Sequence, residues 1–368
     1  MTFIIASMVL MVALVGAILI VTPFIMPPTE CFTVTVPPSS KQDPRVKALY
    51  RGYLIVTALV TVIGMAVASL MLPKADDLTA SVVITVAVLV PLAASFAYML
   101  HARSRVRALK AAEGWVARGS RSAAFVSDGS IPQPVSLAWE LLHVVVVAAI
   151  AAFALLSYDR MPDQIPIHAG LDGTVNSYAD KTLGVALYPV LIAAFMGMAF
   201  TFVHWGVLRS KKPIDPAAPA TSALAYGQFA RLQSIVMLVG GLMLSACMGA
   251  TFLLSSIGAI SLGTAGTIIT VASIAFAAAA IWASAKYGQA GGRTAAELRT
   301  SDEVARDDDR FWKLGFVYFN PDDPSVFVPK RFGMGWTINC GRPAAWAAVI
   351  GIVVLTIGFV VAVEAMLG

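Results

Sequence analysis

Residues 80–100 read ASVVITVAVLVPLAASFAYML and carry no charged side chain. An α-helix rises about 1.5 Å per residue, so about 20 residues cross the roughly 30 Å hydrocarbon core of a bilayer. A membrane-spanning strand needs only about ten residues and alternates apolar with polar side chains. This run is apolar on every face, and it therefore predicts a transmembrane helix.

The composition of the whole chain extends this prediction beyond one helix. Hydrophobic residues make up 58% of the 368 residues and charged residues 13%, and the mean hydropathy is +0.79. Soluble domains average about 45–50% and about 25%, so a soluble enzyme and a disordered chain are excluded. We predict an all-α, polytopic membrane bundle of about eight transmembrane helices at residues 2–22, 52–72, 80–100, 137–157, 182–208, 232–254, 263–285 and 343–366.

Lysine and arginine alternate between rich and poor loops along the chain. Of these 26 residues, 23 lie in the loops 23–51, 101–136, 209–231 and 286–342, and three lie in the loops between them. Cytoplasmic loops collect Lys and Arg. The pattern predicts a multi-pass protein of the bacterial cell membrane with both termini outside and the four basic loops in the cytoplasm. Orientation thus accounts for the net charge of +5, and no nucleic-acid binding is expected.

Three cysteines, Cys31, Cys247 and Cys340, are isolated in the sequence. They form no CxxC pair and no Cys/His group, so we expect neither a metal centre nor a cofactor. Two of them fall in predicted cytoplasmic loops, where thiols stay reduced, and no disulfide is expected.

Four ionisable residues fall within the predicted helices. Glu140, His143 and His204 lie near predicted cytoplasmic ends, and Glu364 lies near an outer end. Side chains this close to an interface reach water. We therefore predict a structural role for all four and no proton relay across the bilayer.

Small residues in the sixth predicted helix indicate close helix packing. Gly241, Ser245 and Gly249 lie four residues apart and share one helix face. Such a face allows a second backbone to approach. We predict packing within the chain rather than dimerisation, and the sequence leaves the oligomeric state open.

The second basic loop reads as a short amphipathic helix on the inner leaflet. Its charges include Arg103, Arg105 and Arg107, followed by Arg118 and Arg121. Each such charge near anionic lipid contributes about 1 kcal/mol. Lipid contact is the favoured interpretation, and binding of a cytoplasmic partner is the alternative.

The predicted outer loop 158–181 reads YDRMPDQIPIHAGLDGTVNSYADK. Its prolines stiffen the backbone, and Asp172-Gly173 is typical of a tight turn. His168 and the acids around it suggest a cation, but one histidine is too few for zinc and the acids do not match an EF-hand. We predict an ordered loop without metal.

This loop resembles the signature of a bacterial membrane family called domain of unknown function 1648, which includes the SdpI-type immunity proteins. The likeness lies in Pro162-Asp163-x-Ile165-Pro166-x-His168, followed by Gly173, Asn176, Tyr178 and Lys181. The chain departs from the pattern with Met161 for leucine, Ala169-Gly170 for Phe-Asn, Asn176 for aspartate and Tyr178 for tryptophan. The resemblance implies an extracytoplasmic peptide ligand and a cytoplasmic regulator as partners, with ligand contacts at Asp163, Ile165, Pro166, His168, Gly173 and Lys181.

A second resemblance covers residues 311–343, FWKLGFVYFNPDDPSVFVPKRFGMGWTINCGRP, which look like the element called domain of unknown function 5808. Lys330, Arg331 and Trp336 are its candidates for partner or lipid contact. The run Phe32-Thr33-Val34-x-x-Pro37 is similar to a Phe-Gly-Val-x-x-Pro element of such proteins, with Thr33 in place of glycine. The chain then divides into segments 1–136, 137–208, 209–310, 311–343 and 344–368.

Two functional hypotheses follow. An SdpI-like protein would confer immunity to an antimicrobial peptide, or signal its presence, through the outer loop and a cytoplasmic partner. A permease for a small molecule or peptide is the alternative. No Ser/His/Asp group, HExxH motif or pair of intramembrane aspartates is present, so the sequence does not predict an enzyme.

Overall fold

The computed structural model describes residues 2–116, 129–170, 173–298, 302, 304 and 307–367. Within these ranges, eight helical stretches are long and apolar enough to cross a membrane, which confirms the predicted fold class. The long helices are α1 (Thr2–Val21), α2 (Pro44–Met71), α3 (Asp77–Ala112), α4 (Leu142–Leu156), α5 (Leu183–Arg209), α6 (Pro219–Ser256), α7 (Leu262–Tyr287) and α9 (Pro343–Leu367), and α8 (Gly292–Leu298) is short.

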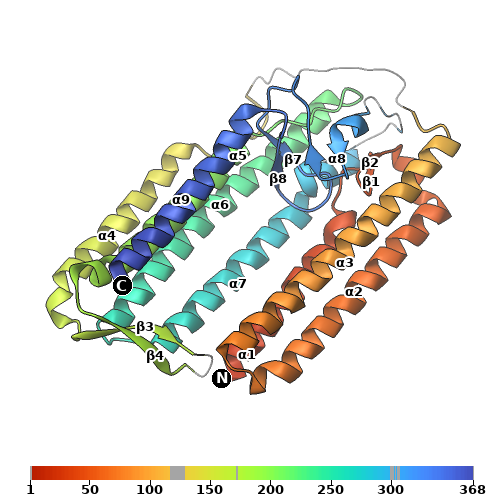
Figure 1. Ribbon diagram of the computed structural model, residues 1–368. Coiled ribbons are helices and arrows are strands. Elements are labelled where there is room, and N and C mark those ends of the chain that lie inside the picture. The colour runs from red at the N-terminus through yellow and green to blue at the C-terminus, as the bar shows by residue number, and fades with distance from the viewer. Residues whose placement is uncertain are drawn as a thin grey trace.

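The long helices form two groups with one helix between them (Figure 1). Helices α1, α2 and α3 pack together, and α4, α5, α6 and α9 form the second group. Helix α7 packs along α6 and also touches α1. The ring of Phe276 on α7 meets Phe200 on α5 edge-on at 5.3 Å, and Gly240 on α6 leaves room for it. The membrane domain thus consists of two helix groups that lie side by side, and α7 lies between them and contacts both.

Strands occur only as short antiparallel pairs in the described parts of the chain. They are β1 (Glu30–Cys31) with β2 (Val34–Thr35), β3 (Gln164–Ala169) with β4 (Val175–Asp180), β5 (Trp312–Lys313) with β6 (Val317–Tyr318), and β7 (Phe327–Pro329) with β8 (Trp336–Ile338). The pair β3–β4 lies at the end that holds both termini, here called the hairpin end. The other pairs and α8 lie at the opposite end, here called the basic end.

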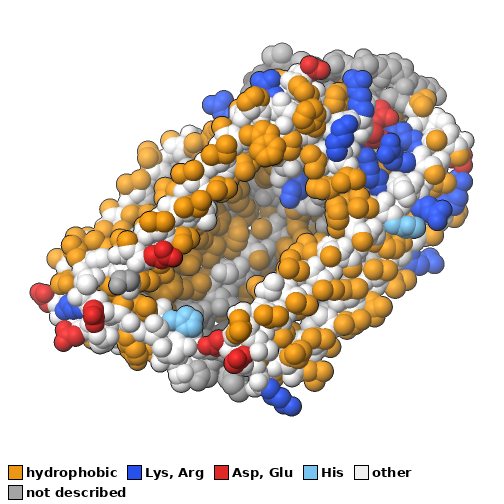
Figure 2. Space-filling view, in the orientation of Figure 1, with side chains coloured by type: hydrophobic (Ala, Val, Ile, Leu, Met, Phe, Trp, Pro, Cys, Tyr) orange, Lys and Arg blue, Asp and Glu red, His pale blue; other side chains and the backbone are white. Residues whose placement is uncertain are grey.

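The two ends differ in charge as the loop pattern predicts. Lys and Arg side chains gather at the basic end, beside α8 and the short strands (Figure 2). Both termini lie at the other end, as an even number of spans requires. Which end faces the cytoplasm stays a prediction from the charge pattern.

Helix α3 is longer than the predicted span and replaces the separate amphipathic helix. It begins after Asp76, whose carboxylate accepts a hydrogen bond from the Thr79 amide at 2.9 Å and caps the first turn. It then continues unbroken through Arg103, Arg105 and Arg107 to Ala112. The prediction of an independent helix on the membrane surface is therefore wrong for these arginines. Arg118 and Arg121 lie outside the described residues.

The small residues of α6 pack within the chain, as predicted. A Cβ atom at Gly241 would lie 2.7 Å from Cβ of Phe200 on α5. One at Gly249 would lie 2.4 Å from the Ile150 side chain on α4 and 3.0 Å from Ala193 on α5. Helix α6 therefore approaches α4 and α5 closely along this face.

Candidate functional site

The predicted outer loop folds into the hairpin β3–β4. Ile165 pairs with Ala179 and His168 pairs with Ser177, and the register shifts on either side of His168. The turn closes where the Gly170 amide donates to the Thr174 carbonyl at 2.9 Å, and Gly173 adopts a φ of +83° that favours glycine. Asp172 of the predicted turn lies outside the described residues.

Two of the predicted ligand residues anchor this hairpin instead of facing outward. Ile165 is 1% exposed and belongs to a buried cluster with residues of α4, α5 and α6. Lys181 donates from Nζ to the Met161 carbonyl at 2.9 Å and from its amide to the Asp163 carbonyl at 2.8 Å. These contacts fix the base of the hairpin, whereas the Asp163 side chain stays exposed.

His168 is exposed and forms a polar chain that reaches the other helix group. Its Nδ1 lies 2.6 Å from Oδ1 of Asn176, and Asn176 Nδ2 donates to Asp77 Oδ2 on α3 at 3.4 Å. Because the Asn176 amide nitrogen faces Asp77, its oxygen accepts from His168, which places a proton on Nδ1. The hairpin is attached to α4 and α5, so this chain bridges the two groups.

A cavity of about 610 Å³ lies beneath this bridge, between the hairpin, α3 and α7. Its polar lining includes His168, Asp77 and Ser81, and its apolar lining includes Ile167, Ile84 and Phe252. Figure 2 shows the surface hollowed between the two helix groups. The space admits a ligand with one polar and one apolar face.

A second cavity of about 390 Å³ borders α7 toward the basic end. Its lining is mostly apolar and includes Met237, Ile281 and Trp336. Trp336, a predicted contact residue, packs its ring 5.7 Å from that of Phe229 on α6. Trp336 therefore lines a cavity. It also packs the 311–343 element against the helices.

Arg331 is buried in the centre of the basic end and has two acidic partners. Its exposed fraction is 6%, its Nη1 lies 2.5 Å from Asp309 Oδ1, and its Nε lies 3.3 Å from Glu30 Oε1. Lys110 on α3 also binds Asp309, at 2.8 Å. The network links α3, the β1–β2 turn and the 311–343 element.

Arg103 is likewise 6% exposed and holds the β1–β2 turn from the α3 side. It donates to the Thr33 carbonyl at 2.6 Å and to the Trp312 carbonyl at 3.2 Å. Thr33 has a φ of +67°, a backbone conformation that favours glycine. The interpretation of Arg103 and Arg331 as lipid or partner contacts is wrong because both are used inside the protein, whereas Arg105, Arg107 and Lys330 are exposed.

Burial and charge shift the pKa values of the two acids in opposite directions. Burial raises the pKa of Glu30 to about 7, although the Arg331 charge opposes the rise. Burial also disfavours the Asp309 charge, but Arg331 and Lys110 outweigh it and hold the pKa of Asp309 at about 2. Asp309 is thus fully ionised at neutral pH, whereas Glu30 titrates near pH 7.

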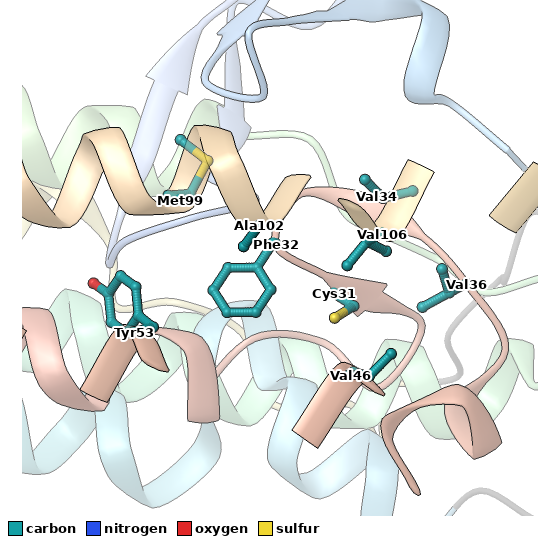
Figure 3. Packing of buried hydrophobic residues seen from close by; sticks show 9 residues of the cluster. All are labelled: Cys31, Phe32, Val34, Val36, Val46, Tyr53, Met99, Ala102 and Val106. Carbon is teal, nitrogen blue, oxygen red and sulfur yellow. The ribbon is translucent and has the colours of Figure 1, made fainter. Parts of the chain in front are cut away.

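Apolar packing completes the basic end. Figure 3 shows Phe32 of the β1–β2 turn beside Tyr53 on α2, Cys31 near Val46 on α2, and Val34 near Val106 on α3. Within the part of the chain that the structure describes, no group of three or more His, Cys, Asp and Glu side chains is arranged to hold a metal ion.

The three polar residues predicted to reach water are instead buried together. Glu140 and His143 are each 5% exposed and His204 is 0% exposed, and the carboxylate contacts both imidazoles. The i,i+3 spacing of Glu140 and His143 places them on one helix face. Their pairing with His204 had no signal in the sequence, since it depends on how α4 packs on α5.

Two family models match parts of this chain. Residues 144–193 match a domain of unknown function, DUF1648, and residues 321–346 match a family of unknown function, DUF5808. The first match covers α4, the hairpin and the start of α5, and the second covers β7, β8 and the start of α9. The two matches confirm that parts of the chain resemble these two domains of unknown function. No curated protein and no solved structure matches the chain.

The cysteines offer a test of both the orientation and the packing of the basic end. Cys340 is half-buried, whereas Cys31 is 1% exposed and burial raises its pKa to about 11 from an ordinary value of 9.0. We expect an impermeant maleimide to leave Cys340 unmodified in intact cells and to label it once the membrane is opened. Cys31 should resist labelling even then. Its raised pKa makes the reactive thiolate about 100-fold less abundant than in a cysteine of ordinary pKa, and the surrounding side chains shield the sulfur from the reagent.

Mass spectrometry of the Cys31 and Cys340 peptides gives the extent of labelling. A denatured sample is the control, in which both thiols react. Labelling of Cys340 in intact cells would reverse the predicted orientation, and equal labelling of both thiols in opened cells would contradict the packing.

Proposed function

We propose that this multi-pass membrane protein binds an amphipathic peptide at its hairpin end and serves in SdpI-like immunity or signalling. The observation that carries the proposal is the His168–Asn176–Asp77 chain, which bridges both helix groups above a cavity of about 610 Å³. A peptide helix with polar and apolar faces matches the mixed lining of that cavity. The DUF1648 match includes every described part of the hairpin.

Helix α3 supports the signalling part of the proposal. Its first turn carries Asp77, which meets Asn176 at the hairpin end. Its far end carries Arg103, which holds the β1–β2 turn and the Trp312 carbonyl at the basic end. A ligand that replaces the Asp77 contact therefore acts on a rigid element that reaches the opposite side.

Substitution of His168 tests the recognition step. Cells expressing the chain are challenged with a panel of antimicrobial peptides, and survival is measured at matched membrane protein levels. For a peptide against which the chain protects, His168→Ala should reduce protection about tenfold, the equivalent of about 1.4 kcal/mol of binding energy. Pro166→Ala should cause a smaller loss through added backbone freedom.

Tyr178→Ala is the matched control, because Tyr178 is 54% exposed on the same hairpin and does not line the cavity. It should retain full protection. Full protection by the His168→Ala protein at an equal protein level would remove His168 from the site. A fall in protein level alone would give it a structural role.

A permease is the second candidate, and the apolar cavity on the same helix α7 favours it. A transported solute has to pass this second space, whereas a receptor does not use it. Filling it with Ile281→Trp should stop peptide uptake into proteoliposomes and leave peptide binding unchanged. A receptor without transport shows no uptake in either protein.

A further inference from the structure

Glu140, His143 and His204 form a buried polar cluster at the basic ends of α4 and α5. Glu140 lies in the 3₁₀ turn Leu137–Leu141 that precedes α4. His204 Nδ1 lies 2.6 Å from Glu140 Oε1, and His143 Nδ1 lies 2.9 Å from Oε2. Both carboxylate oxygens are therefore engaged by ring nitrogens.

The partner of the other His204 nitrogen shows where protons must be. Nε2 of His204 lies 3.0 Å from the Val135 carbonyl oxygen. A carbonyl oxygen only accepts, so Nε2 carries a hydrogen. The short contact between Nδ1 and Oε1 then needs one further proton, on either the imidazole or the carboxyl group. Without it, two lone pairs would face each other at 2.6 Å.

His143 is a donor to the same carboxylate. Its Nδ1 also lies 3.3 Å from the Glu140 carbonyl, so Nδ1 carries a hydrogen and faces two acceptors. Its Nε2 is buried and has no hydrogen-bond partner among the described residues. A Cβ atom at Gly241 would lie 3.1 Å from this nitrogen, so α6 covers it. A second bound proton would remain there without an acceptor, which limits the cluster to one.

Neighbouring elements offer no competing charge to the cluster in the described structure. Helix α5 adds the Thr201 hydroxyl, 3.4 Å from Glu140 Oε2, and α6 adds Ser234, which accepts from the Val135 amide. The nearest charged residues along these helices, Arg209 and Arg231, are exposed. The proton is therefore held by the three side chains alone.

We infer that Glu140, His143 and His204 constitute a proton-binding site that holds one shared proton and fastens the basic end of α4 to α5 and to residue Val135. The hairpin β3–β4 joins the same two helices at their other ends. The site thus fastens, at the opposite end, the pair of helices that carries the hairpin, whatever the hairpin binds.

Replacing the carboxylate tests the shared proton. Glu140→Gln keeps a donor for His204 Nδ1 but removes the shared proton. In this variant, Nδ1 of His204 should therefore lose its hydrogen, while Nε2 keeps the hydrogen that faces the Val135 carbonyl.

The ring nitrogens of His204 are compared by NMR between the full wild-type chain and the Glu140→Gln variant, both in detergent micelles. Glu364→Gln is the matched control, because Glu364 is an exposed carboxyl on α9. It should leave the His204 nitrogens unchanged. Identical Nδ1 signals in the wild type and Glu140→Gln would show a purely structural role and overturn the inference.

A second measurement needs no destabilising variant. The chain has four histidines, and selective ¹⁵N labelling resolves their ring nitrogens by NMR. His204→Gln identifies the His204 signals by their loss. At pH 7.5 we expect hydrogen on Nε2 of His204 and a proton shared at Nδ1. A His204 ring with a bare Nε2 would overturn the assignment, whatever the variants do.

Discussion

Replacement of Arg331 by methionine is expected to destabilise the basic end by about 3–5 kcal/mol. Methionine preserves most of the apolar stem of the side chain but removes the charge. Glu30 and Asp309, which lie 3.3 and 2.5 Å from the guanidinium, are then left without their main buried partner. The change also removes the hydrogen bond to the Thr33 carbonyl. Unfolding of the full chain in micelles, followed by tryptophan fluorescence, measures the loss.

The loss of stability in the Arg331→Met variant should depend on pH, in a direction that the pKa shifts predict. Asp309 has a pKa lowered to about 2 from 3.8, so its contribution is present above pH 3.8 and is lost as the pH falls toward 2. The shift corresponds to about 2.4 kcal/mol, at 1.36 kcal/mol per pH unit. Arg331→Met should therefore cost most near neutral pH and less in acid.

Glu30 acts in the opposite sense. Its raised pKa means that the folded protein binds a proton between pH 4.5 and about 7, so its contribution to stability decreases as the pH rises through that window. Without Arg331 this decrease should extend to higher pH. Lys330→Met is the matched control, because the neighbouring Lys330 is exposed and should cost less than about 0.5 kcal/mol. Equal losses in the two variants would contradict the assigned network.

Gly291→Ala should have the second large effect, about 2–5 kcal/mol. Gly291 has a φ of +80°, where a side chain costs about 1–2 kcal/mol. A Cβ atom there would also lie 2.4 Å from the Ala225 carbonyl oxygen and 2.8 Å from the Tyr226 nitrogen. Both atoms belong to the α6 backbone, so the corner between α7 and α8 has to move away, at a further cost of about 1–3 kcal/mol.

Gly335→Ala separates the two contributions. Gly335 has a φ of +88°, but a Cβ atom there would meet nothing within 4 Å. This variant should lose only the conformational part, about 1–2 kcal/mol. The same unfolding assay in micelles compares the two proteins. A similar loss in both would mean that the α7–α8 corner does not depend on close contact with α6.

The number of spans could be predicted from residues such as 80–100, because hydrophobic length is a local property. Bilayer thickness requires about 20 apolar residues in any sequence context. The turn at Gly173 and the close packing at Gly249 could also be predicted, because the turn depends on the φ of one residue and the packing on the small size of one residue. Helix ends were less predictable. Helices α3 and α6 continue into polar segments beyond the bilayer, where hydrophobicity carries no signal.

Contacts between distant residues explain what the sequence could not predict. Arg103 and Arg331 look like surface charges in their own segments. They lie 228 positions apart in the sequence, yet both donate to the Thr33 carbonyl. Glu140 and His204 meet because α4 packs directly on α5, where a Cβ atom at Gly197 would lie 2.9 Å from the His143 ring. Burying a charge is favourable only with a partner in place, and only the tertiary structure supplies that partner.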